Sequence, residues 1–149
     1  MTQSRPTTRT IPMTETYTGG CACGAIRYEI KAAPIAMIDC QCRQCQHESG
    51  TGHQSHMTFP RDAVKLEGEA RHWNMVGDGG TAKSRSFCPT CGSPVYMTFR
   101  DVPEFFLVRA GSLDDPSRYK PQQVTWTAAG HAWDHIDPSL RTFEKMPPG

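Results

Sequence analysis

The sequence has no apolar run approaching the roughly 20 residues that an α-helix needs to cross a bilayer. It also lacks an excess of charge of one sign, because 16 basic residues stand against 15 acidic ones. This balance gives no bulk attraction to nucleic acid or to an anionic membrane, and we predict neither as a partner. Internal repeats, phosphate-binding loops, dinucleotide fingerprints and Ser-His-Asp arrangements are missing as well. The sequence therefore argues against several large classes of protein before any motif is considered.

The length of 149 residues fits one domain. Residues 1–12 are polar, rich in Thr and without the apolar core of a signal peptide, so we expect a flexible leader followed by one zinc-binding domain over residues 13–149. We expect the chain to be cytoplasmic, where thiols stay reduced. Seven cysteines cannot all pair within one chain, and in a reducing compartment closely spaced cysteines are typical of metal ligands or redox groups.

The composition favours short strands and turns, since Gly (13) and Pro (12) are frequent. Apolar residues alternate with charged ones over residues 26–31, which predicts a half-buried strand. Residues 95–99 and 105–110 are rich in aromatic and β-branched side chains and predict two more strands. Further strand candidates are residues 58–59, 64–66, 72–76, 84–87 and 124–127. Residues 35–38 are a short apolar run that leads into the second cysteine group, and residues 131–143 form either a short helix or an extended wrapping segment. We therefore predict a mainly β fold, a single domain of short antiparallel sheets stapled by zinc with few short helices.

The cysteines fall into three groups. They are spaced as C-x-C, C-x-C-x-x-C and C-x-x-C, at Cys21 and Cys23, at Cys40, Cys42 and Cys45, and at Cys88 and Cys91. Tetrahedral zinc holds thiolates at about 2.3 Å, so ligand sulfurs must lie only a few ångströms apart. The glycines beside the first and third groups permit the tight turns that this requires.

The simplest partition gives two zinc ions per chain. The first and third groups together supply four thiolates, the usual composition of a closed structural site. The middle group supplies three, and its fourth position would hold water or a substrate sulfur, as catalytic zinc requires. The predicted ligands are Cys21, Cys23, Cys88 and Cys91 at the structural site and Cys40, Cys42 and Cys45 at the catalytic site.

Three other arrangements of the cysteines stay open. All seven could surround one structural zinc, with the surplus merely buried. Cys42 and Cys45 could form a thioredoxin-like redox pair, although no βαβ pattern surrounds them. An iron–sulfur cluster would need a fourth ligand beside the middle trio.

The ordered motifs resemble the GFA family, the glutathione-dependent formaldehyde-activating enzymes, which share a domain with centromere protein V. The resemblance rests on Gly19-Gly20-Cys21-x-Cys23-Gly24-Ala25-Ile26-x-Tyr28, on Cys40-x-Cys42-Arg43-x-Cys45-Gln46-x-x-Ser49-Gly50, on Phe87-Cys88-Pro89-x-Cys91-Gly92-Ser93 and on Gly111-Ser112-Leu113-Asp114-Asp115-Pro116. It spans roughly residues 16–146. It implies a mainly β fold, the same zinc partition, and an activity that joins formaldehyde to glutathione as S-(hydroxymethyl)glutathione. Gln41 and His47 depart from the family pattern, in which His and Arg are common.

The resemblance implies a carbon–sulfur lyase, in which Cys40, Cys42 and Cys45 would hold a catalytic zinc. A small thiol such as glutathione would bind as a thiolate and attack a small aldehyde. Arg43 either offsets the charge of the site, holds a substrate carboxylate or is a solvated surface residue. The surrounding His47, His53 and His56 are candidate proton donors, a fourth ligand, or ordinary loop histidines. A non-catalytic zinc-stabilised binding module and a thiol redox or metal-handling protein are the alternative functions.

Overall fold

A computed structural model of the chain describes residues 16–147, so the leader predicted at residues 1–12 lies outside the described residues. The described chain contains one α-helix, short 3-10 helices and the strands of two sheets. The strands are β1 (Thr16–Gly20), β2 (Arg27–Lys31), β3 (Ala36–Cys40), β4 (Gln54–Pro60), β5 (Val64–Glu67), β6 (Arg71–Val76), β7 (Ala82–Phe87), β8 (Pro94–Phe99), β9 (Phe105–Arg109), β10 (Gln123–Thr125) and β11 (Arg141–Thr142). The helices are α1 (Arg43–Ser49) and the 3-10 turns η2 (Arg61–Ala63), η3 (Ala110–Ser112), η4 (Pro116–Arg118) and η5 (Thr127–Ala129).

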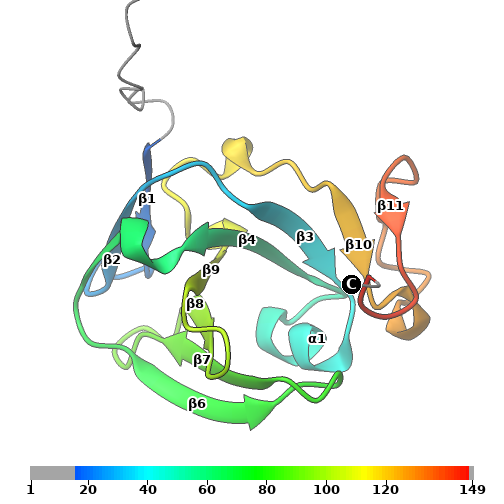
Figure 1. Cartoon of the computed structure of the whole chain (residues 1–149), viewed down its shortest axis with the longest axis horizontal. Helices are drawn as coiled ribbons and strands as arrows, with labels where there is room; N and C mark the ends of the chain where they lie inside the picture. The colour runs from blue at the N-terminus through cyan, green and yellow to red at the C-terminus, as the bar shows by residue number, and fades with distance from the viewer. Residues whose placement is uncertain (1–15, 148–149) are drawn as a thin grey trace, which may run out of the picture.

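The prediction of a mainly β fold is confirmed. Strands β1, β2 and β5 form a three-stranded sheet, and the other eight form a sheet in the order β11-β10-β3-β4-β9-β8-β7-β6. Pairing is antiparallel except at β10, which runs parallel to both β3 and β11. The large sheet curls so strongly that α1 lies inside its curve, beside β4 (Figure 1). None of the helices within residues 16–147 is long and apolar enough to cross a membrane.

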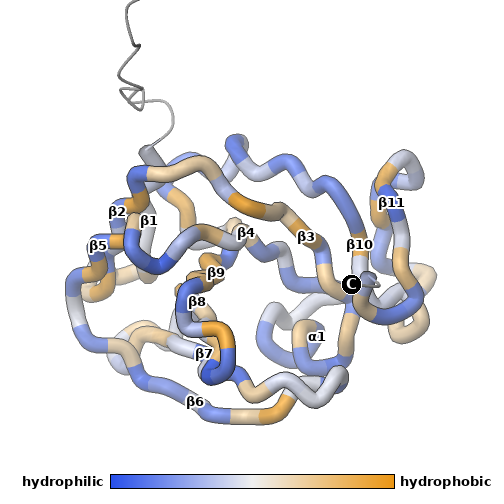
Figure 2. The backbone as a smooth tube through the Cα atoms, viewed as in Figure 1, coloured by the Kyte–Doolittle hydropathy of each residue, from blue (hydrophilic) through white to orange (hydrophobic). Residues whose placement is uncertain are grey.

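The main core lies between the small sheet and the central strands of the large one. The predicted alternation is realised in β2, where Tyr28 and Ile30 are buried and Lys31 is exposed. Phe59 of β4 and Phe106 of β9 are fully buried, and the Phe106 ring stacks on Tyr96 with centroids 4.7 Å apart. Hydrophobic and polar positions accordingly alternate along several strands (Figure 2). This core holds β4 and β9 in place, and these two strands carry His56 and Arg109, which are described below.

Helix α1 was not predicted, because its seven residues are too few to show a helical period. It begins at Cys42, whose Sγ accepts a hydrogen bond from the Cys45 backbone N–H, and ends at Gly50 with φ of 73°. The thiol therefore takes the place of the usual Ser, Thr, Asp or Asn cap. Residues 131–147 contain no helix; they form turns and the short strand β11, which pairs with β10.

Gly68 lies in the turn between β5 and β6, where both its backbone conformation and the space around its Cα leave no room for a side chain. Its φ is +90°, and an added Cβ would lie 2.0 Å from the Ala25 carbonyl oxygen. We expect Gly68→Ala to lower the free energy of unfolding by more than about 1 kcal/mol, since both the conformation and the space oppose a side chain. Gly80 has φ of +85° but an open Cβ position, so Gly80→Ala is the matched control. Urea unfolding of both variants measures the difference, and equal losses would contradict the close approach.

Candidate metal centres

The first and third cysteine groups meet at one point. Cys21 and Cys23 lie in the turn between β1 and β2, and Cys88 and Cys91 lie between β7 and β8. Their four Sγ atoms all lie within 4.8 Å of one another. The Cys21–Cys23 and Cys23–Cys88 sulfur distances are 3.6 and 3.7 Å, close to the roughly 3.8 Å between sulfurs on a tetrahedral zinc. The donor set therefore fits a four-thiolate metal site, which stays a prediction.

Local backbone geometry prepares these sulfurs for a metal. The Ile26 N–H donates to Cys21 Sγ at 3.2 Å, and the Cys91 N–H donates to Cys88 Sγ at 3.5 Å. Gly24 and Gly92 have φ of 83° and 75°, which lets the two turns close around their thiols. Hydrogen bonds from Ser93 lower the pKa of Cys91 to about 5, so its thiolate forms readily. The site joins the small sheet to the large one across 65 residues of chain.

The middle group forms a second, fully buried cluster. Cys40 ends β3, Cys42 caps α1 and Cys45 lies in its first turn, and their Sγ atoms lie within 4.8 Å of one another. The Cys42 and Cys45 side chains lower the pKa of Cys40 to about 2, and the same contacts raise the pKa of Cys45. Cys40 therefore loses its proton more readily than Cys45 does, and a cation held by the trio would take the place of the protons. Trp126, which follows β10, packs against the cluster.

His56 of β4 is the histidine that contacts this trio. Its Nε2 lies 3.4 Å from Cys45 Sγ, and its Nδ1 lies 2.6 Å from Arg109 Nη1. Burial, reinforced by the charge of Arg109, holds the pKa of His56 well below its ordinary value. Burial and the neighbouring Arg85 likewise lower the pKa of Arg109 to about 9, which leaves the guanidinium protonated at neutral pH.

A buried charge cluster lies directly behind His56. Glu48 of α1 forms ion pairs with Arg85 of β7 and Arg109 of β9, and the exposed fraction of the three side chains is 11, 6 and 4% respectively. This cluster was not predicted from the sequence. One signal was available: both arginines lie within segments predicted as strands, Arg85 in 84–87 and Arg109 in 105–110. Such a charge is usually buried only when it is paired.

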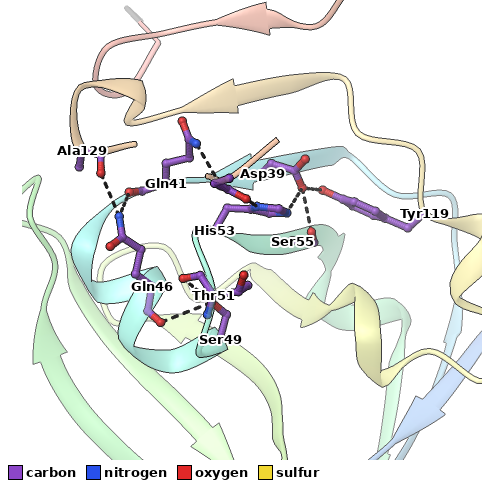
Figure 3. Close-up of polar contacts among 10 residues, drawn as sticks. Asp39, Gln41, Gln46, Ser49, Thr51, His53, Ser55, Tyr119 and Ala129 are labelled. Atoms are coloured by element: carbon purple, nitrogen blue, oxygen red, sulfur yellow. Dashed lines mark hydrogen bonds and ion pairs between the residues drawn. The ribbon is translucent and has the colours of Figure 1, made fainter. Parts of the chain in front are cut away.

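A second polar network joins residues near the end of β3 to Asp134 and Tyr119, and Figure 3 shows its members Asp39, Gln41, His53, Ser55 and Tyr119. Asp134 accepts hydrogen bonds from Gln41 Nε2 at 3.0 Å and from His53 Nδ1 at 2.8 Å. Asp39 accepts from the Tyr119 hydroxyl at 2.6 Å and from Ser55 at 2.8 Å. His53 is therefore held between two carboxylates and has no contact with the cysteines. Asp39 is the last residue of β3 before Cys40, so these hydrogen bonds hold the end of that strand in place.

Arg43 and His47 lie on the exposed face of α1. Arg43 hydrogen-bonds Gln46, and its Nη2 lies 3.4 Å from His47 Nε2. Gln46 is itself buried, and its Nε2 donates to the carbonyl oxygens of Gln41 and Ala129 at 2.8 and 3.0 Å (Figure 3). Arg43 thus holds a helix-surface contact instead of pointing at the sulfurs.

Two cavities border the charge cluster. A cavity of about 840 Å³ is lined by α1 and by strands β6, β7 and β8, and its wall includes His47, Arg71, His72, Trp73 and Arg85. A second cavity of about 550 Å³ adjoins the four-cysteine site and Arg109. Glu48 lines both. Trp73 lines the larger cavity and is 55% exposed, so it lies at the rim of that cavity.

A family model described as glutathione-dependent formaldehyde-activating enzyme matches residues 16–129, which include both cysteine clusters. The chain belongs to the GFA family. The predicted resemblance is thereby confirmed, and the family is named for an enzyme. The match ends before Asp134, so the contacts of Asp134 with Gln41 and His53 involve a segment outside it.

A solved structure has a similar fold. The crystal structure of a Rhodobacter sphaeroides protein is similar with a TM-score of 0.53 and 17% sequence identity, over 85% of this chain and 98% of that protein. At this identity the similarity concerns the fold alone.

Proposed function

We propose that this GFA chain is a zinc-dependent enzyme of the carbon–sulfur lyase type, acting on the adduct of a small thiol and a small aldehyde at Cys40, Cys42 and Cys45. Glutathione and formaldehyde are the pair that the family name suggests. One observation carries the proposal: three thiols converge in a buried cluster of three, the ligand number of a catalytic zinc. The four-cysteine cluster, by contrast, has the ligand number of a structural site.

Zinc at the trio would supply a substrate thiolate at neutral pH by accepting a thiol in its remaining position. The chain's own residues shape the surroundings. Burial of the three sulfurs excludes water from the reacting region, which strengthens electrostatic interactions there. Trp126 packs against the cluster and contributes an apolar surface beside it.

The larger cavity suits an anionic thiol. Its wall carries the exposed Arg71, and α1, which bears Cys45, forms part of the same wall. Guanidinium groups bind carboxylates by paired charge-assisted hydrogen bonds. The exposed indole of Trp73 offers an apolar surface at the rim. This combination supports a carboxylate-bearing thiol such as glutathione as the substrate class.

Zinc analysis of Cys42→Ser tests the two-site arrangement. We expect two zinc ions per wild-type chain and one in the variant, with the fold retained, because the four-cysteine site shares no ligand with the trio. Metal content after size-exclusion chromatography, with circular dichroism as the check on folding, measures both. Cys91→Ser is the matched variant in the other cluster. A wild-type protein that retains a single zinc ion after careful preparation would overturn the arrangement.

The enzymatic assignment has a separate test. Exchange NMR follows the formation and breakdown of S-(hydroxymethyl)glutathione with and without protein. We expect the wild type to accelerate exchange over the spontaneous reaction and Cys42→Ser to abolish the acceleration. No acceleration with glutathione or with other small thiols would favour a binding module.

A further inference from the structure

A continuous chain of polar contacts runs from the trio into the charge cluster. His56 links Cys45 Sγ to Arg109, and Arg109 pairs with Glu48, which also pairs with Arg85. Glu48 lies three residues after Cys45 on the same short helix, so both ends of the chain of contacts are anchored on α1. No step of the zinc chemistry above uses these residues.

The contacts specify where the proton of His56 lies. A guanidinium has only N–H groups to offer, so Arg109 Nη1 donates to Nδ1 of His56 and this nitrogen carries a lone pair. The ring proton is then on Nε2, which faces Cys45 Sγ at 3.4 Å and donates to it. A protonated Nε2 has no lone pair for a metal. His56 therefore cannot complete the coordination of a metal at the trio while Arg109 holds Nδ1.

The net charge of the three-cysteine centre and that of the charge cluster also balance each other. Zinc with three thiolates would carry a net charge of −1, and Glu48 with two arginines carries +1. Both groups are buried, so an uncompensated charge in either would be costly. The His56 imidazole hydrogen-bonds only one of the three sulfurs, Cys45, so the positive charge of the cluster acts on that sulfur. The other two sulfurs accept hydrogen bonds from different donors. Cys42 accepts from the Cys45 backbone N–H, and Cys40 accepts from the Thr125 hydroxyl.

We propose that His56 is a positioning residue of the three-cysteine centre, which donates from Nε2 to the Cys45 thiolate under the control of Arg109. The hydrogen bond withdraws charge from the thiolate and makes the centre a better acceptor for an incoming thiol. The fixed tautomer keeps the imidazole itself from closing the fourth position. This inference rests on the proposed function in that it assumes a metal at the trio.

Three variants separate this role from simple packing. His56→Gln retains it, because the amide oxygen can accept from Arg109 while the amide N–H donates to Cys45. His56→Phe fills similar space without either hydrogen bond. Arg109→Met frees Nδ1 to carry the proton, so that Nε2 gains a lone pair, while Glu48 keeps its pair with Arg85. The matched control is His53→Phe, which removes a partly buried imidazole that contacts carboxylates but not cysteines.

Two measurements that do not depend on turnover are compared across the variants. The first is the affinity of the second zinc equivalent, by competition with a chromophoric chelator. The second is the affinity of the zinc-loaded protein for glutathione, by calorimetry. We expect His56→Phe to lose roughly 10- to 100-fold in one or both affinities and His56→Gln to recover most of the loss. Arg109→Met is expected to weaken glutathione binding without weakening zinc binding, since the ring can then occupy the fourth position.

The outcomes distinguish the two proposals. Equal zinc and glutathione affinities in wild type, His56→Phe and Arg109→Met would overturn the positioning role even if the enzyme is active. Equal losses in His56→Phe and His53→Phe would overturn it too, because a general packing effect then accounts for both. Conversely, zinc and thiol binding that depend on His56 without any acceleration of exchange would overturn the enzymatic function and leave the positioning role standing.

Discussion

Withdrawal of metal from the four-cysteine site is expected to unfold the domain. A structural zinc contributes on the order of 10 kcal/mol to folding, which is comparable to the whole stability of a typical domain. The four sulfurs join the β1–β2 turn to the β7–β8 turn, and Cys21 and Cys88 are buried beside the main core. Cys88→Ser is therefore expected to give a protein with little cooperative unfolding. Circular dichroism in a urea titration measures the loss.

The matched variant for this prediction is Cys42→Ser at the other cluster. The three-cysteine site lies within β3, α1 and the end of β10. The core and the pairing of the strands already hold these elements together. We expect its unfolding midpoint to stay much closer to that of the wild type. A Cys88→Ser protein, or a chelator-treated wild type, with an unchanged midpoint would show that the four thiols do not hold the fold together.

The second large effect is expected at Glu48. Glu48→Ala leaves Arg85 and Arg109 buried, adjacent and without their carboxylate. Removal of one partner from a buried ion pair typically costs about 3–5 kcal/mol, most of it the penalty of the uncompensated charge. We expect a loss of this size in the free energy of unfolding, measured by urea titration. Glu48→Gln is expected to lose nearly as much, because it keeps the shape of the side chain but not its charge.

Glu67→Ala provides the control for charge removal as such. Glu67 pairs with Lys65 on β5 at 3.7 Å, and both side chains are more than 60% exposed. Exposed pairs contribute at most about 1 kcal/mol, so little change is expected. Losses of similar size in Glu48→Ala and Glu67→Ala would mean that the charge cluster is solvated and does not bear on the trio behind it.

Much of the fold could be predicted locally. Residues 26–31 alternate because one face of β2 meets the core, and the apolar segments at 95–99 and 105–110 form β8 and β9 at the centre of the large sheet. Helix α1 escaped prediction, since a seven-residue helix capped by a thiol carries neither a hydrophobic period nor a common cap residue. The parallel pairing of β10 with β3 could not be predicted either, because it joins segments about 85 residues apart in the sequence.

The sequence by itself determined three local cysteine groups, since the C-x-C and C-x-x-C spacings keep the members of each group close together, and the order of the motifs indicated the family. Only the tertiary structure brought the first and third groups together and decided what surrounds the two clusters. It placed His56 of β4, Glu48 of α1, Arg85 of β7 and Arg109 of β9 together behind one sulfur. The physical reason is that ligand spacing is a local property of the backbone. Compensation of a buried charge depends instead on strands that meet only when the sheet curls around α1.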